Sequence, residues 1–353
     1  MIDCHVHCRD RDESSKETIE HALSVAKDSG LSGIIDKPNT KPLATTKKEI
    51  EIRLSYAKEA QSRLFGESFP VFYGIDMGVT SDKYQLKEAV ETWREYFPKE
   101  NSKFGVTGLK MFAGKSIGDM AIIDEEKQLF VYKTLKELGY DGVLVVHCEK
   151  EKYIDNQLWN PEKPSSQDIA RPEKAEIESV RDQMDFARHV HYDGCLHIAH
   201  VSTPESVDLI NYEADYLHMS CGVTPHHLLL DTLIMDTMRN GFLWKVNPPL
   251  RKPETRKKLL KYFLEGRIDI LESDHAPHTY DEKMNGHLSG IPNLASWPDF
   301  TALLKKEGMN DFLLERASHE NPCVIYGIRI PRLNFPLKNR VKDYVFDPYK
   351  PLK

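Results

Sequence analysis

Short apolar runs alternate with longer amphipathic stretches along most of the chain. Runs rich in Val, Ile, Leu, Phe and Tyr, and bounded by Gly, Asp, Asn or Pro, predict eight strands: residues 2–7, 33–36, 71–77, 107–112, 142–147, 196–201, 216–223 and 268–274. A helical periodicity predicts helices between these strands and after the last one: residues 14–29, 46–62, 124–138, 173–191, 254–265, 296–306 and 311–318. At the start of the second helix, Thr46 and Glu49 have the spacing of a capping box.

Strands that alternate with helices indicate a parallel sheet, and 353 residues suit a closed (β/α)8 barrel. A doubly wound sheet is less favoured because no GxGxxG motif follows the first strand. The barrel with its C-terminal helices is predicted to span residues 1–328. Residues 329–353, rich in Pro and basic side chains, are predicted to form an extended tail that packs on the barrel.

Composition and charge narrow the class of protein. Hydrophobic residues make up 40% of the chain and charged residues 29%, which is typical of a soluble globular protein. The net charge of −7, with scattered Lys and Arg, argues against a nucleic-acid surface. No apolar stretch is long enough to cross a bilayer, and the first residues lack the pattern of a signal peptide. We therefore expect a cytoplasmic protein whose six cysteines, without CxxC spacing, are free thiols.

Polar side chains collect at the C-terminal ends of the predicted strands, where the active sites of (β/α)8 barrels lie. His5 and His7 close the first strand and, two residues apart, point to the same side. His147 ends the fifth strand, His200 the sixth and Asp274 the eighth. Each histidine alone is more often a surface or hydrogen-bonded structural residue than a metal ligand. Together, on one rim of one barrel, they predict a metal site that suits zinc.

Lys110 is an unusual residue among the apolar positions of the fourth strand. Because a buried ammonium is costly, this lysine either extends its amine to solvent or is chemically altered. With a lowered pKa, the neutral amine can react with carbon dioxide to give a carbamate, an anion that bridges two cations. Asp274 adds a carboxylate that can bind metal and exchange a proton with bound water.

In combination, these residues resemble the amidohydrolase superfamily and, within it, the dihydroorotases. The resemblance covers most of the chain, from residue 2 to residue 292. It rests on the motifs Asp3-Cys-His-Val-His-Cys-Arg-Asp10, Pro38-Asn-Thr40, Gly108-Leu-Lys-Met-Phe112, Val146-His-Cys-Glu149, His200-Val-Ser202, Thr224-Pro-His-His227, Val246-Asn-Pro-Pro-Leu250, Ser273-Asp-His-Ala-Pro-His278 and Gly290-Ile-Pro292.

The resemblance implies a centre of two Zn²⁺ ions at the rim of the barrel. The implied ligands are His5, His7 and Asp274 for the more buried ion, His147 and His200 for the other, and carboxylated Lys110 with a hydroxide between the two. The hydroxide would attack the ring amide, and Asp274 would take its proton and pass it to the leaving nitrogen. The implied reaction is the reversible hydrolysis of (S)-dihydroorotate to N-carbamoyl-L-aspartate, a step of pyrimidine biosynthesis.

The substrate of a dihydroorotase carries a carboxylate, whereas hydantoins, dihydropyrimidines and allantoin do not. Arg9 has the parity of the two N-terminal histidines and can bind a carboxylate through its guanidinium fork, the alternative being an ion pair at the surface. By resemblance, Asn39 and His278 complete the carboxylate pocket. The backbones of Asn247 and Pro292 would hold the ring.

Two other functions are weighed against this one. A hydantoinase, dihydropyrimidinase or allantoinase is the alternative among enzymes, and Arg9 with Asn39 speaks against it. A barrel kept only as a scaffold is disfavoured because all the expected metal ligands are present. We expect a small anionic substrate and no nucleic-acid or membrane partner, and we leave a homodimer open.

Several positions depart from the family pattern. The loop after the first strand reads Arg-Asp-Arg-Asp in place of Arg-(Asp/Glu)-Pro-Gly, Lys37 stands where a Met usually precedes Pro-Asn, and Asn293 and Ala295 replace a Gly and a Glu. Relatives often carry a small β domain. Here only residues 341–347 resemble its last strand, so this domain is expected to be absent or vestigial. The polar segment 279–289 is predicted to be a mobile lid over the substrate.

Overall fold

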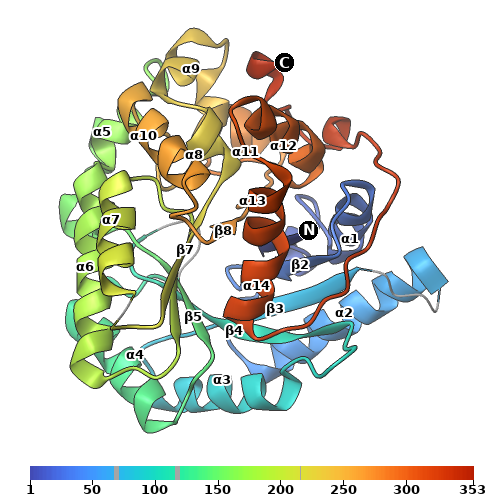
Figure 1. Cartoon of the computed structure of the whole chain (residues 1–353), viewed down its shortest axis with the longest axis vertical. Coiled ribbons are helices and arrows are strands. Elements are labelled where there is room, and N and C mark those ends of the chain that lie inside the picture. Colours follow the sequence, from blue (N-terminus) through green and yellow to red (C-terminus); the bar gives the residue numbers. More distant parts are fainter. Residues whose placement is uncertain (67–70, 116–119, 215) are drawn as a thin grey trace.

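The computed structural model describes residues 1–66, 71–115, 120–214 and 216–353. At its centre is a sheet of eight parallel strands in sequential order, surrounded by helices (Figure 1). The strands are β1 Ile2–Val6, β2 Gly33–Asp36, β3 Phe72–Gly78, β4 Phe104–Phe112, β5 Val143–His147, β6 Cys195–Ile198, β7 Met219–Val223 and β8 Ile270–Leu271. All eight predicted strands are present, and the prediction of a (β/α)8 barrel is confirmed.

The segment after β8 completes the barrel by pairing with β1. The backbone N–H of His7 donates to the carbonyl of His275 at 2.8 Å, and Val6 forms a parallel bridge with the same residue. The sequence predicts β8 up to residue 274, but the strand ends at Leu271. Asp274 lies outside the strand because its φ of 44° is left-handed, a conformation that an extended strand cannot contain.

Helices surround the sheet and continue beyond the last strand. Those that the sequence predicts are present with shifted ends: α1 Ile19–Asp28, α2 Lys47–Phe65, α4 Glu125–Glu137, α6 Glu173–Val190, α10 Pro253–Leu264, α12 Trp297–Lys306 and α13 Asp311–Glu315. The structure adds α3 Lys83–Tyr96, α5 Ser166–Ala170, α7 Pro204–Glu213, α8 Pro225–Leu229, α9 Thr232–Thr237, α11 Tyr280–Met284 and α14 Asn321–Tyr326.

Side-chain caps set the starts of two predicted helices. α1 begins later than predicted because Thr18 caps it by accepting from the backbone N–H of His21. At α2, Thr46 accepts from the backbone N–H of Glu49 at 3.2 Å. Glu49 turns its carboxylate toward Arg11, 3.5 Å from Nε, instead of completing the predicted capping box.

The buried apolar residues form two layers, one on each side of the sheet. In β5, Val143 and Val145 belong to the cluster inside the barrel, whereas Leu144 and Val146 belong to the larger cluster beneath the helices. This alternation follows from the period of two residues in a strand. At the N-terminal end of the barrel, α14 crosses the opening, and its Tyr326 is buried against the inner cluster (Figure 1).

A bulge in β1 turns both N-terminal histidines into the barrel. The register of β1 against β2 shifts between Asp3 and Val6. Cys4 packs in the inner cluster and Val6 in the outer one, yet His5 and His7 line the central cavity. Side chains alternate along a strand, so without the shift His5 and His7 would point away from the side that Cys4 faces, toward the helices. The two histidines point to the same side, as predicted, and the bulge determines that this side is the barrel interior.

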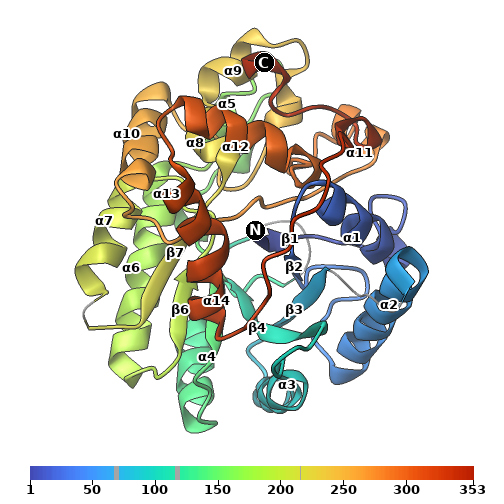
Figure 2. The same ribbon diagram turned by 45° about the vertical axis from the view of Figure 1, so that its right-hand side comes forward.

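The C-terminal tail runs along the barrel past α1 and toward α11 (Figure 2). Lys338 pairs with Asp28 at 3.0 Å, and the hydroxyl of Tyr344 donates to Glu17 at 2.8 Å. Residues 341–347 form a 3₁₀ turn and irregular chain. Their likeness to a strand was therefore misleading, because side-chain contacts to α1, and no neighbouring strand among the described residues, hold this segment. The boundary at residue 329 stays a prediction.

Two further observations concern the strands and helices of the described ranges as a set. Every strand there belongs to the barrel sheet. No helix in these ranges combines the length and the apolar character that crossing a membrane requires.

Candidate metal centre and substrate cavity

A cavity opens at the C-terminal ends of the strands, the end of a barrel where catalytic residues gather. Eight of the predicted site residues line it: His5, His7, Arg9, Asn39, His147, His200, Asn247 and Asp274. They come from strands and loops that lie far apart in the sequence. Phe112, Val246, Ala276, Ser289 and Gly290 complete the wall.

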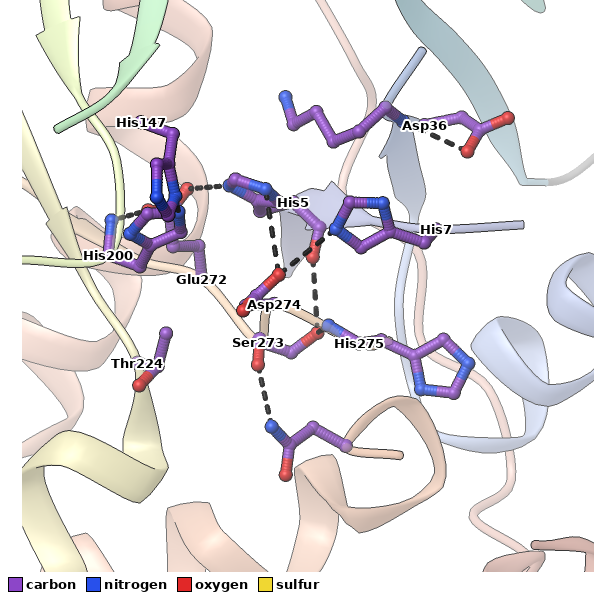
Figure 3. A network of polar contacts seen from close by, with 12 residues as sticks. His5, His7, Asp36, His147, His200, Thr224, Glu272, Ser273, Asp274 and His275 are labelled. Carbon is purple, nitrogen blue, oxygen red and sulfur yellow. Dashed lines mark hydrogen bonds and ion pairs between the residues drawn. The ribbon is translucent and has the colours of Figure 1, made fainter. Parts of the chain in front are cut away.

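Asp274 lies between the two N-terminal histidines (Figure 3). Its Oδ1 is 3.1 Å from His7 Nε2 and 3.6 Å from His5 Nε2. Ligand atoms of the three residues lie within 4.8 Å of one another, and all three residues are buried. Burial lowers the pKa of His5 and of His7 well below 6.5, so both imidazoles are neutral and offer lone pairs. Two neutral imidazoles and a carboxylate are a donor set that fits Zn²⁺.

The second histidine pair lies on the other side of His5 (Figure 3). His147 Nδ1 is 3.1 Å from His200 Nε2, and the rings are 4.9 Å apart. The other ring nitrogen of His147 contacts Glu149 at 3.0 Å, which directs Nδ1 toward His200. Burial raises the pKa of Glu149, but Arg171, which donates to it at 2.6 and 2.9 Å, outweighs burial and brings the pKa down to about 2.

Lys110 projects into the barrel below this cavity. Its side chain is fully buried, and its Nζ has no hydrogen-bond partner within the described part of the chain. Burial, helped by the nearby charge of Lys37, lowers the pKa of Lys110 to about 7. A neutral amine is therefore accessible at neutral pH. Lys110 does not itself line the cavity, and its Nζ lies 5.0 Å from the ring centre of Phe112.

Arg9 carries a positive charge into the same cavity. Its side chain is buried, and its Nε and Nη1 have no hydrogen-bond partner among the residues that the structure describes. Its backbone has a left-handed φ of 49°, and its carbonyl accepts from Nη1 of Arg53 at 2.9 Å. Arg53 in turn donates to Asp36 at 2.5 Å, and Tyr73 donates to the same carboxylate at 2.7 Å. This buried network fixes the backbone from which the guanidinium of Arg9 extends.

The remaining predicted residues occupy two places. Asn247 lines the central cavity, where its side-chain oxygen accepts from Gln167 at 2.8 Å. His278 and Pro292 line a neighbouring cavity of about 230 Å³. His278 Nε2 contacts the carbonyl of Ser289, a residue that lines the central cavity, at 3.0 Å. Burial, with a contribution from the charge of Arg9, lowers the pKa of His278 to about 3.

The predicted lid segment, 279–289, borders both cavities. It contains α11, which Thr279 and Glu282 start with a complete capping box. Lys283 is buried, and its Nζ donates to the carbonyls of Leu288 and Gly290 at 2.9 and 2.8 Å. These bonds anchor the segment at the rim of the site. Its mobility stays a prediction.

Three charged residues of the barrel interior were not predicted to lie there: Lys37 stood out in the sequence only as a departure from the family pattern, and Asp76 and Glu272 did not stand out at all. Lys37 and Asp76 form a fully buried ion pair, and Thr107 donates to Asp76 at 2.8 Å. Glu272 lies beside His5 and His200 (Figure 3). The sequence signal for these residues is a charged side chain in an otherwise apolar strand. This signal marks the residue as unusual but does not identify the residues that it contacts.

The chain is similar in sequence to dihydroorotases of several organisms. No protein-family model matches the chain. It is 31% identical over 337 residues to a dihydroorotase of Methanothermobacter thermautotrophicus, covering 93% of this chain and 69% of the relative. It is 30% identical over 357 residues to a dihydroorotase of Thermococcus kodakarensis, covering 100% of this chain and 74% of the relative.

Solved structures of hydantoinases and of a dihydroorotase share the fold. An L-hydantoinase from Arthrobacter aurescens superposes with a TM-score of 0.77 at 22% identity, covering 92% of this chain and 70% of the hydantoinase. A dihydroorotase from Campylobacter jejuni superposes with a TM-score of 0.66 at 17% identity, covering 94% and 84%. At such identities the structures establish the barrel fold alone. The sequence relatives go further: the chain belongs to the dihydroorotase family.

Proposed function

We propose that the protein is a dihydroorotase that catalyses the reversible hydrolysis of (S)-dihydroorotate to N-carbamoyl-L-aspartate. The observation that carries the proposal is the guanidinium of Arg9, which is buried in the same cavity as the His–Asp cluster. A buried charge without a partner is costly, and an anionic ligand removes that cost. A bidentate carboxylate fits the guanidinium fork.

We further propose two Zn²⁺ ions as the cofactor. His5, His7 and Asp274 would hold one ion and His147 and His200 the other, with carboxylated Lys110 between them. Bound zinc would lower the pKa of a water molecule and polarise the amide carbonyl. The neutral imidazoles, the carboxylate at 3.1 Å from His7 and the unpaired Lys110 amine in the described structure support this ligand set.

The protein's own groups would move the proton and orient the ring. Asp274 lines the cavity with a carboxylate that can accept a proton from the attacking water and return it to the leaving nitrogen. Arg9, Asn39 and His278 would hold the substrate carboxylate, and the backbones of Asn247 and Pro292 would hold the ring amide. We propose a cytoplasmic location and a small anionic substrate, and the oligomeric state stays open.

The assay compares metal-loaded protein on dihydroorotate, hydantoin and allantoin, for the wild type and for Arg9→Ala. Losing one partner of a buried charged pair typically costs about 2–5 kcal/mol, so we expect kcat/KM on dihydroorotate to fall by roughly 30-fold or more. Arg11→Ala is the matched control, because Arg11 contacts Tyr56 outside the cavity. Unchanged turnover by Arg9→Ala would refute the carboxylate argument. Equal turnover of hydantoin by the wild type would favour the hydantoinase alternative.

A further inference from the structure

Glu272 lies at the centre of the barrel interior, directly after β8, and its side chain is fully buried. Its Oε1 accepts from the backbone N–H of His200 at 2.6 Å. Its Oε2 is 3.5 Å from His5 Nδ1 and 3.7 Å from His197 Nε2. One carboxylate thus faces residues of β1, β6 and the segment after β6 at once, and Figure 3 shows its contacts with His5 and His200.

The contact with His200 stabilises an unusual backbone. His200 has a φ of 40°, a left-handed backbone conformation that residues other than glycine rarely adopt. Such conformations persist where the surrounding structure holds them. The short hydrogen bond to Glu272 holds the peptide N–H of His200 from inside the barrel, and so determines where its imidazole meets His147.

The contact with His5 selects one ring tautomer. His5 Nδ1 has no hydrogen-bond partner within the described ranges, and at 3.5 Å it faces Oε2 of Glu272, which also faces His197 Nε2 at 3.7 Å. When Nδ1 carries the proton and points to the carboxylate, Nε2 presents its lone pair toward Asp274 and the cavity. Carboxylates that face metal-binding histidines in this way orient the ring and raise its basicity.

Gly222, which has no side chain, leaves room for the carboxylate of Glu272. A Cβ atom on Gly222 of β7 would lie 2.3 Å from Oε1 of Glu272. No real side chain can occupy that space while Glu272 keeps its place. Gly222 and Glu272 are therefore matched, and a substitution at either position disturbs the same carboxylate.

We infer that Glu272 is a positioning residue that holds His5 and His200, one from each proposed zinc site, in a fixed relation to each other. The inference deepens the proposed function, on which it rests for the role of the metals. Glu272 touches no substrate; it acts through the two histidines. Replacing Glu272 should therefore weaken metal binding while the protein stays folded.

The test measures zinc affinity by chelator competition and the visible spectrum of the Co²⁺-substituted protein, both without substrate. In Glu272→Gln, the amide oxygen can still accept from His200, but the NH₂ group opposes the N–H of His5. We expect a loss of about 10–100-fold in zinc affinity, the range for partners of metal-ligating histidines, and a shifted Co²⁺ spectrum. Gly222→Ala should produce the same shift while the carboxylate remains in the chain.

Ser206→Ala is the control, since Ser206 is buried and contacts Thr203 at 2.7 Å but neither Glu272 nor a proposed ligand, and it should leave both readouts unchanged. Wild-type zinc affinity and an unshifted spectrum in folded Glu272→Gln and Gly222→Ala would overturn the inference. Because no substrate is present, the outcome is separate from the activity assay. A wild type that binds zinc but turns over hydantoin alone would refute the proposed substrate and leave the role of Glu272 standing.

Discussion

The buried ion pair of Lys37 and Asp76 allows a sharp test of how this barrel tolerates charge. Both side chains are fully buried in the barrel interior, and Thr107 is a further donor to Asp76. Lys37 also lies 5.8 Å from the ring centre of Tyr326, which covers the N-terminal end of the barrel. The perturbation is a double-mutant cycle: Lys37→Met, Asp76→Leu and the two together.

The expected magnitudes follow from burial. Removing one partner leaves the other as an unpaired charge without solvent, which costs about 3–5 kcal/mol in free energy of unfolding. An exposed pair would cost at most about 1 kcal/mol. Replacing both charges by apolar side chains removes the desolvation penalty together with the attraction, so the double variant should be within a few kcal/mol of the wild type, or more stable. The single effects should therefore be strongly non-additive.

Urea unfolding measures these differences when circular dichroism and tryptophan fluorescence give coincident transitions. With a slope of about 3 kcal/mol per M, each single substitution should lower the midpoint by about 1 M or more. The double variant should recover most of that loss. A Lys37→Met midpoint within about 0.3 M of the wild type, or single effects that simply add in the double variant, would refute the reasoning.

Three further predictions concern the site and the tail. Asp274→Asn should lower kcat by roughly 10²–10⁴-fold, the usual worth of a general base, and an unchanged pH–rate profile at wild-type rate would contradict this. The bond to Glu17 raises the pKa of His21 above 6.5, so this contact stabilises the fold fully below pH 6.5 and is lost as pH rises through the raised pKa. The Tm difference between the wild type and His21→Gln should thus be largest in acid and vanish in base, and a difference that does not change with pH would contradict the assignment. Hydrogen exchange in residues 279–289 should slow when ligand binds, and equal protection with and without ligand would argue against a lid.

The architecture and most of the cavity could be predicted because both depend on local patterns. Apolar runs separated by helical periodicity determine the order of strands and helices. In a parallel barrel, the last residues of all strands meet at one rim, so His147, at the end of β5, is near the rim whatever its partners are. Lys110 stood out in the sequence as a charged residue among the apolar positions of a strand.

Features that depend on contacts distant in sequence could not be predicted. The bulge between Asp3 and Val6 reverses which residues of β1 face inward, and nothing in the alternation of that strand reveals it. The partner of Lys37 is 39 positions away, and Glu272 reaches His200 across 72 positions. A sequence shows that a buried charge needs a partner, but the register of the sheet decides which residue supplies it.

Backbone conformation connects the residues that line the site with the buried residues that support them. Arg9, His200 and Asp274 all have positive φ, at 49°, 40° and 44°, and each lies where its strand has just ended. Such conformations cost of order 1–3 kcal/mol each and need support from the surrounding fold. For Arg9 the support is Arg53, and for His200 it is Glu272, both buried and neither in contact with substrate in our proposal. The residues that would do the chemistry could be found from their type and position, whereas the residues that aim them are recognisable only from the folded backbone.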